Sequence, residues 1–528
     1  MLMHKLNRMP DKNEFLAFLS AIVSGILIYI KWITGPLVNR EMLLCGTLYK
    51  YGWQWEDSQG RPLLRYLSAI SGDFVLPGLS VITCIVLTGV LAVMLVRLFE
   101  IKSRPACIAC GFILCISPSF CSLMCYYYCL DAYTLACLLS VLFVMLAVQG
   151  KIWKCISAAG ALFISLNIYQ AYLGTAITLS VFYLIYINVV KHYTLGEILR
   201  TFARLCISGV SGIVSYIVVF KIYCAVTPAE ATSNRGFDKM GTLPLGQLDT
   251  LIKRAYGTFY DYYIRDNLFA HSFMCWGWIN LAIVLFLVLT IVIKVIRERK
   301  QHTIWTMATA AFFVAIIPLS VMSIAVYGYG ANLYGSTAAI MIPHLNYIYI
   351  FLIAMLLNHG GDKERAAEIY KGAGCALLAA ISFVLLLYTQ IFATCADQEL
   401  RQTSTVADQI LVALRELPEY EAGMSLVVIG DFHEGNYPRY PLYPETTMLH
   451  EVVRGTEIYS GCIHPDYDSR MYCWINFLGF YKGAVFSEYD ETKLEALIES
   501  DEVKNMPLLP VKGSARMIGD VAVVKLAD

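Results

Sequence analysis

The chain has 528 residues, of which 58% are hydrophobic and only 15% are charged, and its mean hydropathy is +0.60. A soluble domain carries about a quarter charged residues. Its 40 basic residues balance 40 acidic ones, so no net charge favours nucleic acid as a partner. This composition excludes an ordinary soluble enzyme, a disordered protein and a small disulfide-rich secreted module. A membrane protein with many spans remains, with the lipid bilayer as its first partner.

Apolar runs long enough to cross about 30 Å of hydrocarbon recur along the chain. They predict eleven spans, at residues 15–34, 75–97, 106–126, 130–148, 153–168, 170–190, 203–226, 273–294, 305–327, 337–358 and 373–394. The fold class that follows is mainly α: a polytopic membrane bundle of about 11 transmembrane helices.

Lys and Arg residues fall in alternate connections between these runs. The connections near 127–130, 167–170 and 328–336 contain neither residue, whereas those between them hold several each. Because Lys and Arg are enriched in cytoplasmic loops, this alternation predicts a cytoplasmic N-terminus. An odd number of spans then places the chain after residue 395 on the outer side.

Three polar regions therefore share the predicted outer face: loop 35–74, loop 227–272 and the tail 395–528. The tail is long enough for a domain of ordinary size. We predict the following elements in it: a helix at Asp397–Pro418 with Val406, Ile410, Leu411, Leu414 and Leu417 on one stripe, a strand at Ser425–Gly430, a helix at Asp490–Val503 and a strand at Val521–Leu526. The prediction is two domains, a membrane-embedded region at 1–394 and a small extracytoplasmic α/β domain at 395–528.

The first outer loop concentrates acidic, basic and aromatic residues in one short stretch. These are Glu41, Trp53, Trp55, Glu56, Asp57 and Arg61. One interpretation is an aromatic belt with solvated charges at the membrane surface. The other is a site where a carboxylate activates a hydroxyl, Arg61 binds a phosphate and the Trp rings stack on a sugar. Glu41 follows the first run by about seven residues, so it would lie level with the lipid headgroups.

Further candidates lie on the same predicted face. Asp131 follows three tyrosines at the mouth of the fourth run, where an ionisable residue is a functional candidate or simply a first-turn acid of a helix. Tyr169 and Gln170 occupy the next outer connection and could bind a sugar or only pack. Arg235 and Asp238 lie in the second outer loop among many tyrosines, which suits a carbohydrate or phosphate surface as well as any exposed loop.

Several catalytic motifs are missing from the sequence. It contains no GxxxxGK[ST], no HExxH and no GxSxG, so ATP-driven or hydrolytic enzymes of those types are excluded. The adjacent carboxylates Glu56 and Asp57 could hold a divalent cation, but two carboxylates are too few to define a metal site. We predict no other cofactor.

A set of short segments occurs in a particular order: an acid close to the first span, the W…GR ending at Trp53 to Arg61, YYY..D.Y at 126–133, IYQAYL at 168–173, RGFD at 235–238 and IGDVAVVKL at 518–526. In this order and spacing the chain resembles, through nearly its whole length, the bacterial GtrII-type glucosyltransferases of the polytopic GT-C class.

The resemblance implies a multi-pass enzyme of the bacterial cytoplasmic (inner) membrane. Such enzymes move a sugar, here glucose by analogy, from a polyprenyl-phosphate carrier such as undecaprenyl phosphate to a surface glycan such as O-antigen, with inversion at the anomeric carbon. An acid in the first outer loop is their expected general base, and Glu41 matches it best. Many relatives carry an Asp there, often paired with a second acid, whereas the adjacent pair here is Glu56–Asp57, so the base stays open among these three residues.

Two other functions compete with this interpretation. A transporter or flippase of lipid-linked saccharides would carry charged residues deep in its spans and show twofold organisation. Apart from Lys31 and Lys221, the predicted spans carry almost no charge, which favours the enzyme. A scaffold whose tail binds other envelope proteins is the third alternative.

Overall fold

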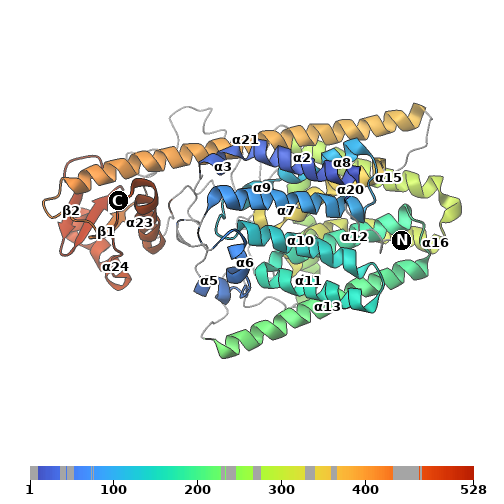
Figure 1. Ribbon diagram of the computed structural model, residues 1–528, viewed down its shortest axis with the longest axis horizontal. Helices are drawn as coiled ribbons and strands as arrows, with labels where there is room; N and C mark the ends of the chain where they lie inside the picture. Colours follow the sequence, from blue (N-terminus) through green and yellow to red (C-terminus); the bar gives the residue numbers. More distant parts are fainter. Residues whose placement is uncertain are drawn as a thin grey trace.

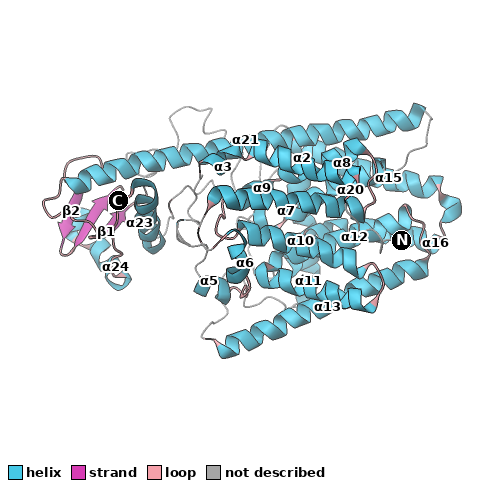
Figure 2. Ribbon diagram, in the orientation of Figure 1, coloured by secondary structure: helices cyan, strands magenta, loops and turns pink. Residues whose placement is uncertain are grey.

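A computed structural model describes residues 10–35, 43, 53–72, 74, 76–227, 232, 245–265, 275–327, 339–357, 365–431, 463 and 467–527. The described chain is mostly helical, with one small sheet (Figure 2). A bundle of helices makes up most of the molecule, and one long helix leads from it to the sheet (Figure 1).

The helices of the bundle are α2 (Lys12–Ile28), α3 (Ile30–Thr34), α5 (Trp53–Ser58), α6 (Leu64–Leu67), α7 (Pro77–Leu98), α8 (Arg104–Cys115), α9 (Pro118–Leu123), α10 (Leu130–Ala147), α11 (Ile152–Ile168), α12 (Leu173–Val189), α13 (Leu195–Val226), α14 (Leu248–Tyr263), α15 (Trp276–Arg297), α16 (Ile304–Ala315), α17 (Ile317–Val321), α18 (Ile324–Tyr327) and α20 (Tyr347–Leu357). The remaining elements are α21 (Arg365–Arg415), β1 (Ser425–Ile429), α23 (Tyr467–Lys482), α24 (Glu491–Glu499), α25 (Asp501–Lys504), β2 (Ala515–Ile518) and β3 (Val521–Lys525).

Several of these helices can cross a membrane. Among the described residues, six helical segments are long and apolar enough, and they lie in α7, α10, α12 with the 3-10 turn before it, α13, α15 and α21. Shorter apolar helices include α8, α11 and α16. These segments indicate membrane association, as the composition predicted. The count of eleven spans stays a prediction.

Several of the predicted spans are not continuous helices, and in two of them a proline begins a new helix. The run at 106–126 is divided into α8 and α9, where the Ser117 hydroxyl accepts a hydrogen bond from the Phe120 amide and Pro118 begins the new helix. The run at 305–327 is divided into α16, α17 and α18, with Pro318 at the start of α17. Proline has no N–H to donate and clashes with the preceding turn, so an apolar run containing it need not form one helix.

Small residues let the first helices approach closely. Helix α2 packs against α7 and α8. A Cβ atom at Gly111 of α8 would collide with the Ala17 carbonyl of α2, and one at Gly25 of α2 would lie 2.8 Å from the Ile85 side chain of α7. Interfaces of this kind are typical of helices that pack in membranes. Helix α10 packs in turn against α7 and α11, and α11 packs against α13, which builds the layer that carries the site.

Connections rich in Lys and Arg meet at one end of the bundle. Arg97, in the last turn of α7, pairs with Glu14 of α2 at 3.0 Å. Lys191, after α12, pairs with Glu100, after α7, at 2.6 Å. Helices α5 and α6 lie at the opposite end, on the side of the sheet (Figure 1). The orientation of these two ends across the membrane stays a prediction.

Helix α21 joins the bundle to the sheet. It contains 51 residues and therefore extends about 77 Å. The predicted domain boundary at 394/395 lies inside this helix, since no Gly or Pro interrupts it there. The predicted stripe on its last part is confirmed, because Val406, Ile410 and Leu414 are fully buried.

The sheet has the strand order β1-β3-β2. Strand β1 runs parallel to β3, with Ser425 opposite Val521, and β2 runs antiparallel to β3. The predicted strands thus coincide with β1 and β3 to within one residue. The helix predicted at Asp490–Val503 is instead two helices, α24 and α25, because the Ser500 hydroxyl caps the second one. That this region is a separate extracytoplasmic domain stays a prediction.

Candidate functional site

Helix α5 ends in a glycine turn that brings Arg61 back onto the helix. The amide of Gly60 donates to the Asp57 carbonyl, and the amide of Arg61 donates to the Glu56 carbonyl. Gly60 has a φ of +72°, which an L side chain adopts only with strain. This pair of bonds is the Schellman motif with glycine in its usual place. The turn therefore brings the acidic Glu56 and the basic Arg61, five residues apart in the sequence, into contact.

Arg61 lies between a carboxylate and two tyrosines. Its Nη1 donates to Glu56 Oε2 at 2.8 Å and to the Tyr133 hydroxyl of α10 at 3.0 Å. Its guanidinium lies 4.7 Å from the centre of the Tyr169 ring, and that ring stacks on Tyr133 with centroids 4.3 Å apart. The hydroxyl of Tyr128 donates to Glu56 Oε1 at 3.4 Å. The segment around Tyr128 and Tyr133 and the connection that holds Tyr169 thus both contact the end of the first loop.

Burial would by itself lower the pKa of the Arg61 guanidinium. Tyr133 and Glu56 beside it act in the opposite direction, and the net result is a pKa above the ordinary value. Arg61 is therefore a permanent cation. Its Nε atom is buried and has no hydrogen-bond partner in the part of the chain that the structure describes. One N–H group of this largely buried cation can therefore donate a hydrogen bond to a ligand.

Gln170 holds the glycine turn from the next outer connection. Its Nε2 donates to the Gly60 carbonyl at 2.7 Å, to the Gln59 carbonyl at 2.9 Å and to the Tyr216 hydroxyl at 2.8 Å. The Tyr216 hydroxyl of α13 also donates to the Gly60 carbonyl at 3.0 Å. The side-chain amide of Gln170 and the ring of Tyr169 therefore contact the first loop. Their predicted role in binding a sugar stays a prediction.

Asp57 is the second acid of α5 and is 5% exposed. The Tyr223 hydroxyl of α13 donates to its Oδ2 at 2.6 Å. Its Oδ1 is buried and accepts no hydrogen bond from the described residues. An unsatisfied buried carboxylate oxygen is costly, so it marks a place where a ligand or water would bind. Among the predicted acids that are described, Asp57 has an oxygen to offer, whereas both oxygens of Glu56 have partners.

Asp131 lies in the first turn of α10 and is fully buried. Its Oδ1 accepts a hydrogen bond from the Ala132 amide at 2.9 Å. This is the first-turn position that the sequence allowed as an alternative to a substrate-binding role. Two residues further along, Tyr133 is the residue of α10 that contacts Arg61.

Some predicted site residues fall outside the description. Glu41, Arg235 and Asp238 lie outside the described residues, and the side chains of Trp53 and Trp55 are likewise not described, although both residues belong to α5. Their roles stay predictions.

Three tyrosines of the site have no role in the sequence-based prediction: Tyr133, Tyr216 and Tyr223. Tyr133 ends the YYY..D.Y segment, so the segment indicated its neighbourhood. Tyr216 and Tyr223 lie within one apolar run, where a tyrosine carries no signal of its own. Their spacing of seven residues puts both on one face of α13, which is the pattern that could have indicated them.

Glu56 and Asp57 do not face a common ligand. Glu56 pairs with Arg61 and Asp57 with Tyr223, so the divalent cation considered for this acidic pair gains no support from their geometry. Within the described ranges, three side chains of types that can ligate a metal converge elsewhere, at the other end of the bundle.

The C-terminal region touches the first loop. The side-chain amide of Asn476 in α23 donates to the Leu43 carbonyl at 2.6 Å. Leu43 is fully buried. Leu43, which follows the first helices in the chain, therefore contacts the C-terminal region.

Comparison with known proteins agrees with the resemblance. No curated protein and no solved structure matches the chain. The family described as "Glucosyl transferase GtrII" matches residues 46–357. This match includes Glu56, Asp57 and Arg61, but it begins after Glu41 and ends before the tail, so it does not extend to the IGDVAVVKL segment. Since it spans more than half of the sequence, the chain belongs to the GtrII glucosyl transferase family and is a glycosyltransferase that transfers a sugar from a donor to a glycan acceptor.

Proposed function

We propose that this protein transfers glucose from a polyprenyl-phosphate carrier to a cell-surface glycan, such as O-antigen, with inversion at the anomeric carbon and a GT-C type of mechanism. The observation that carries the proposal is the α5 turn, where the largely buried cation Arg61 and the buried acid Asp57 each keep one atom without a hydrogen-bond partner among the described residues. A sugar phosphate and an attacking hydroxyl require such a donor and such an acceptor.

Asp57 is the base in this proposal. Glu56 accepts hydrogen bonds from Arg61 at one carboxylate oxygen and from Tyr128 at the other. Asp57 keeps Oδ1 for the acceptor, while the Tyr223 bond to Oδ2 orients the carboxylate. Glu41 is the competing candidate and is tested beside it.

The reaction then proceeds in one displacement. The acceptor hydroxyl oxygen bonds to the anomeric carbon while Asp57 Oδ1 takes its proton. The bond between that carbon and the phosphate oxygen breaks, and the electron pair leaves with the lipid phosphate. Arg61 stabilises the negative charge that develops on the leaving phosphate. This electrostatic stabilisation of the transition state is stronger in a site that excludes water. Because the donor carries its own leaving group, no nucleotide site is required.

The proposed location is the bacterial inner membrane, with the α5 end and the tail on the outer side. Support comes from the gathering of Lys and Arg connections at the other end of the bundle. The contact of Asn476 with Leu43 also puts the tail on the same side as the first loop.

The test uses purified full-length protein in lipid vesicles with synthetic polyprenyl-phosphate glucose and the isolated surface glycan. We expect a new glucosidic bond of inverted configuration, detected by NMR of the product. Nucleotide-linked glucose should give no product. Movement of the intact lipid-linked sugar across the vesicle membrane without bond formation would contradict the proposal and favour a flippase.

A further inference from the structure

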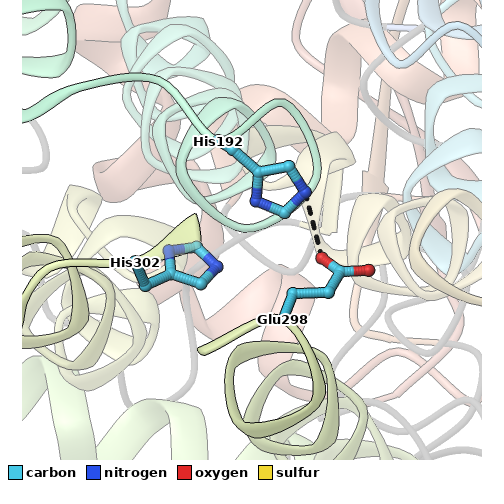
Figure 3. Close-up of side chains that lie close together, drawn as sticks. All are labelled: His192, Glu298 and His302. Carbon is cyan, nitrogen blue, oxygen red and sulfur yellow. Dashed lines mark ion pairs between the residues drawn. The ribbon is translucent and has the colours of Figure 1, made fainter. Parts of the chain in front are cut away.

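A second cluster of reactive side chains lies at the end of the bundle where Lys and Arg gather. It consists of His192, Glu298 and His302 (Figure 3). His192 follows α12, Glu298 follows α15, and His302 precedes α16. Two connections between helices therefore contribute to it, and neither takes part in the α5 site.

The three side chains point toward one another (Figure 3). His192 Nε2 lies 3.0 Å from Glu298 Oε2, and the His192 and His302 rings are 5.1 Å apart. One potential ligand atom from each residue lies within 4.8 Å of the other two. Ligands at about 2.0–2.1 Å from a tetrahedral Zn²⁺ are separated by about 3.4 Å. The His192–Glu298 pair, at 3.0 Å, is slightly closer than this spacing, and the third ligand atom lies within 4.8 Å of both.

The cluster also holds ring nitrogens with nothing to bind. His302 is 9% exposed, and its Nε2 has no hydrogen-bond partner among the residues described. His192 Nδ1 is likewise buried without a partner in the described chain. Each such atom lowers stability unless something satisfies it.

The chemistry of the three groups selects the ligand class. Two imidazoles and one carboxylate form a common ligand set of Zn²⁺ with a fourth position open. Mg²⁺ and Ca²⁺ require oxygen ligands, which this set does not supply in sufficient number. Imidazole suits zinc and its transition-metal neighbours.

We propose that His192, Glu298 and His302 bind one divalent transition-metal ion of the zinc class, which ties the α12–α13 connection to the α15–α16 connection. Such an ion links parts of the bundle that are distant in the sequence and stabilises the folded state by binding to it. The site is separate from glucosyl transfer, so it stands whether or not the proposed reaction is correct.

The test is metal binding by the full chain, purified in detergent with a tag that contains no histidine and treated with chelator. Co²⁺ is the probe, because its visible absorption reports coordination by nitrogen and oxygen ligands. We expect one Co²⁺ per chain, displaced by Zn²⁺ and not by Mg²⁺, and a rise in the thermal unfolding midpoint on binding.

The variants are His302→Ala and Glu298→Gln, of which the second conserves size and preserves the fold. Each should weaken Co²⁺ binding at least about 10-fold. Lys191→Gln is the matched control, because it removes an ion pair in the same connection and leaves the three ligands, and it should bind Co²⁺ like the wild type. Absence of stoichiometric binding by the wild type, or equal binding by wild type and Glu298→Gln, would overturn the proposal.

Discussion

The two ends of the helical bundle each hold a cluster of polar side chains, but they are built in different ways. At the α5 end, Glu56, Asp57 and Arg61 come from one turn of six residues, and tyrosines from α10 and α13 complete it. At the other end, His192, Glu298 and His302 meet only through the packing of α12 against α15 and α16. Functional residues that share one local turn are close together in the sequence and can be recognised there. Residues that are brought together by tertiary packing form no sequence motif.

The largest expected effect contrasts a buried ion pair with a more exposed one. Glu56→Ala leaves Arg61 buried without its carboxylate and should lower the free energy of unfolding by about 3–5 kcal/mol. Lys191→Gln removes the pair with Glu100, whose side chains are 33% and 16% exposed, and should cost about 1 kcal/mol or less. Chemical unfolding in detergent measures both. Equal losses would mean that the two ends are held together equally by their ion pairs.

The next prediction concerns the shape of the cation at the α5 end. Arg61→Lys keeps the charge but loses the planar group that stacks on Tyr169 and binds Glu56 and Tyr133 together. We expect kcat/KM for the lipid-linked donor to fall about 100-fold. A Lys variant with the kcat/KM of the wild type would show that charge alone suffices there.

A smaller effect is expected from the bond that orients Asp57. Tyr223→Phe removes the donor to Oδ2 and should reduce kcat/KM about 10-fold, the value of one hydrogen bond to a charged group. Tyr260→Phe, at a half-exposed tyrosine of α14, is the control and should leave the rate unchanged. If both variants behave alike, Tyr223 does not act through Asp57.

The smallest effect should come from the glycine of the turn. Gly60→Ala forces an alanine into a backbone region with φ of +72° and should lower the free energy of unfolding by about 1–2 kcal/mol. Gly160→Ala, in the middle of α11 with open space around it, should be neutral or stabilising. Thermal unfolding of the two variants compares them. A Gly60→Ala variant as stable as the wild type would show that the turn does not depend on glycine at this position.

Much of the fold was predictable because long apolar runs leave few alternatives to a helix. The runs that became α7, α10 and α15 illustrate this, and the buried strands β1 and β3 were equally predictable as short apolar segments. The breaks were less predictable, since hydropathy alone does not register Pro118 or Pro318. The continuity of α21 through residue 395 was missed for the opposite reason, because a change from apolar to amphipathic composition does not end a helix.

The site was predictable to the extent that it is local. The crowding of Glu56, Asp57 and Arg61 was visible in the sequence, and so was the neighbourhood of Tyr169 and Gln170. Which acid is paired, and which keeps an oxygen without a partner among the described residues, depends on contacts with Tyr223 and Tyr128 that arise from tertiary packing.

The measurement that tests the central claim most directly is the rate of glucosyl transfer by Asp57→Asn, a variant that keeps the size of the side chain and removes its ability to take a proton. Beside it, Glu41→Gln and Glu56→Gln test the other two acids, and Asp249→Asn, at an exposed acid of α14, serves as the control. Transfer by Asp57→Asn should fall by about 10²–10⁴-fold while folding and donor binding persist. Wild-type turnover in Asp57→Asn, together with its loss in Glu41→Gln, would contradict it.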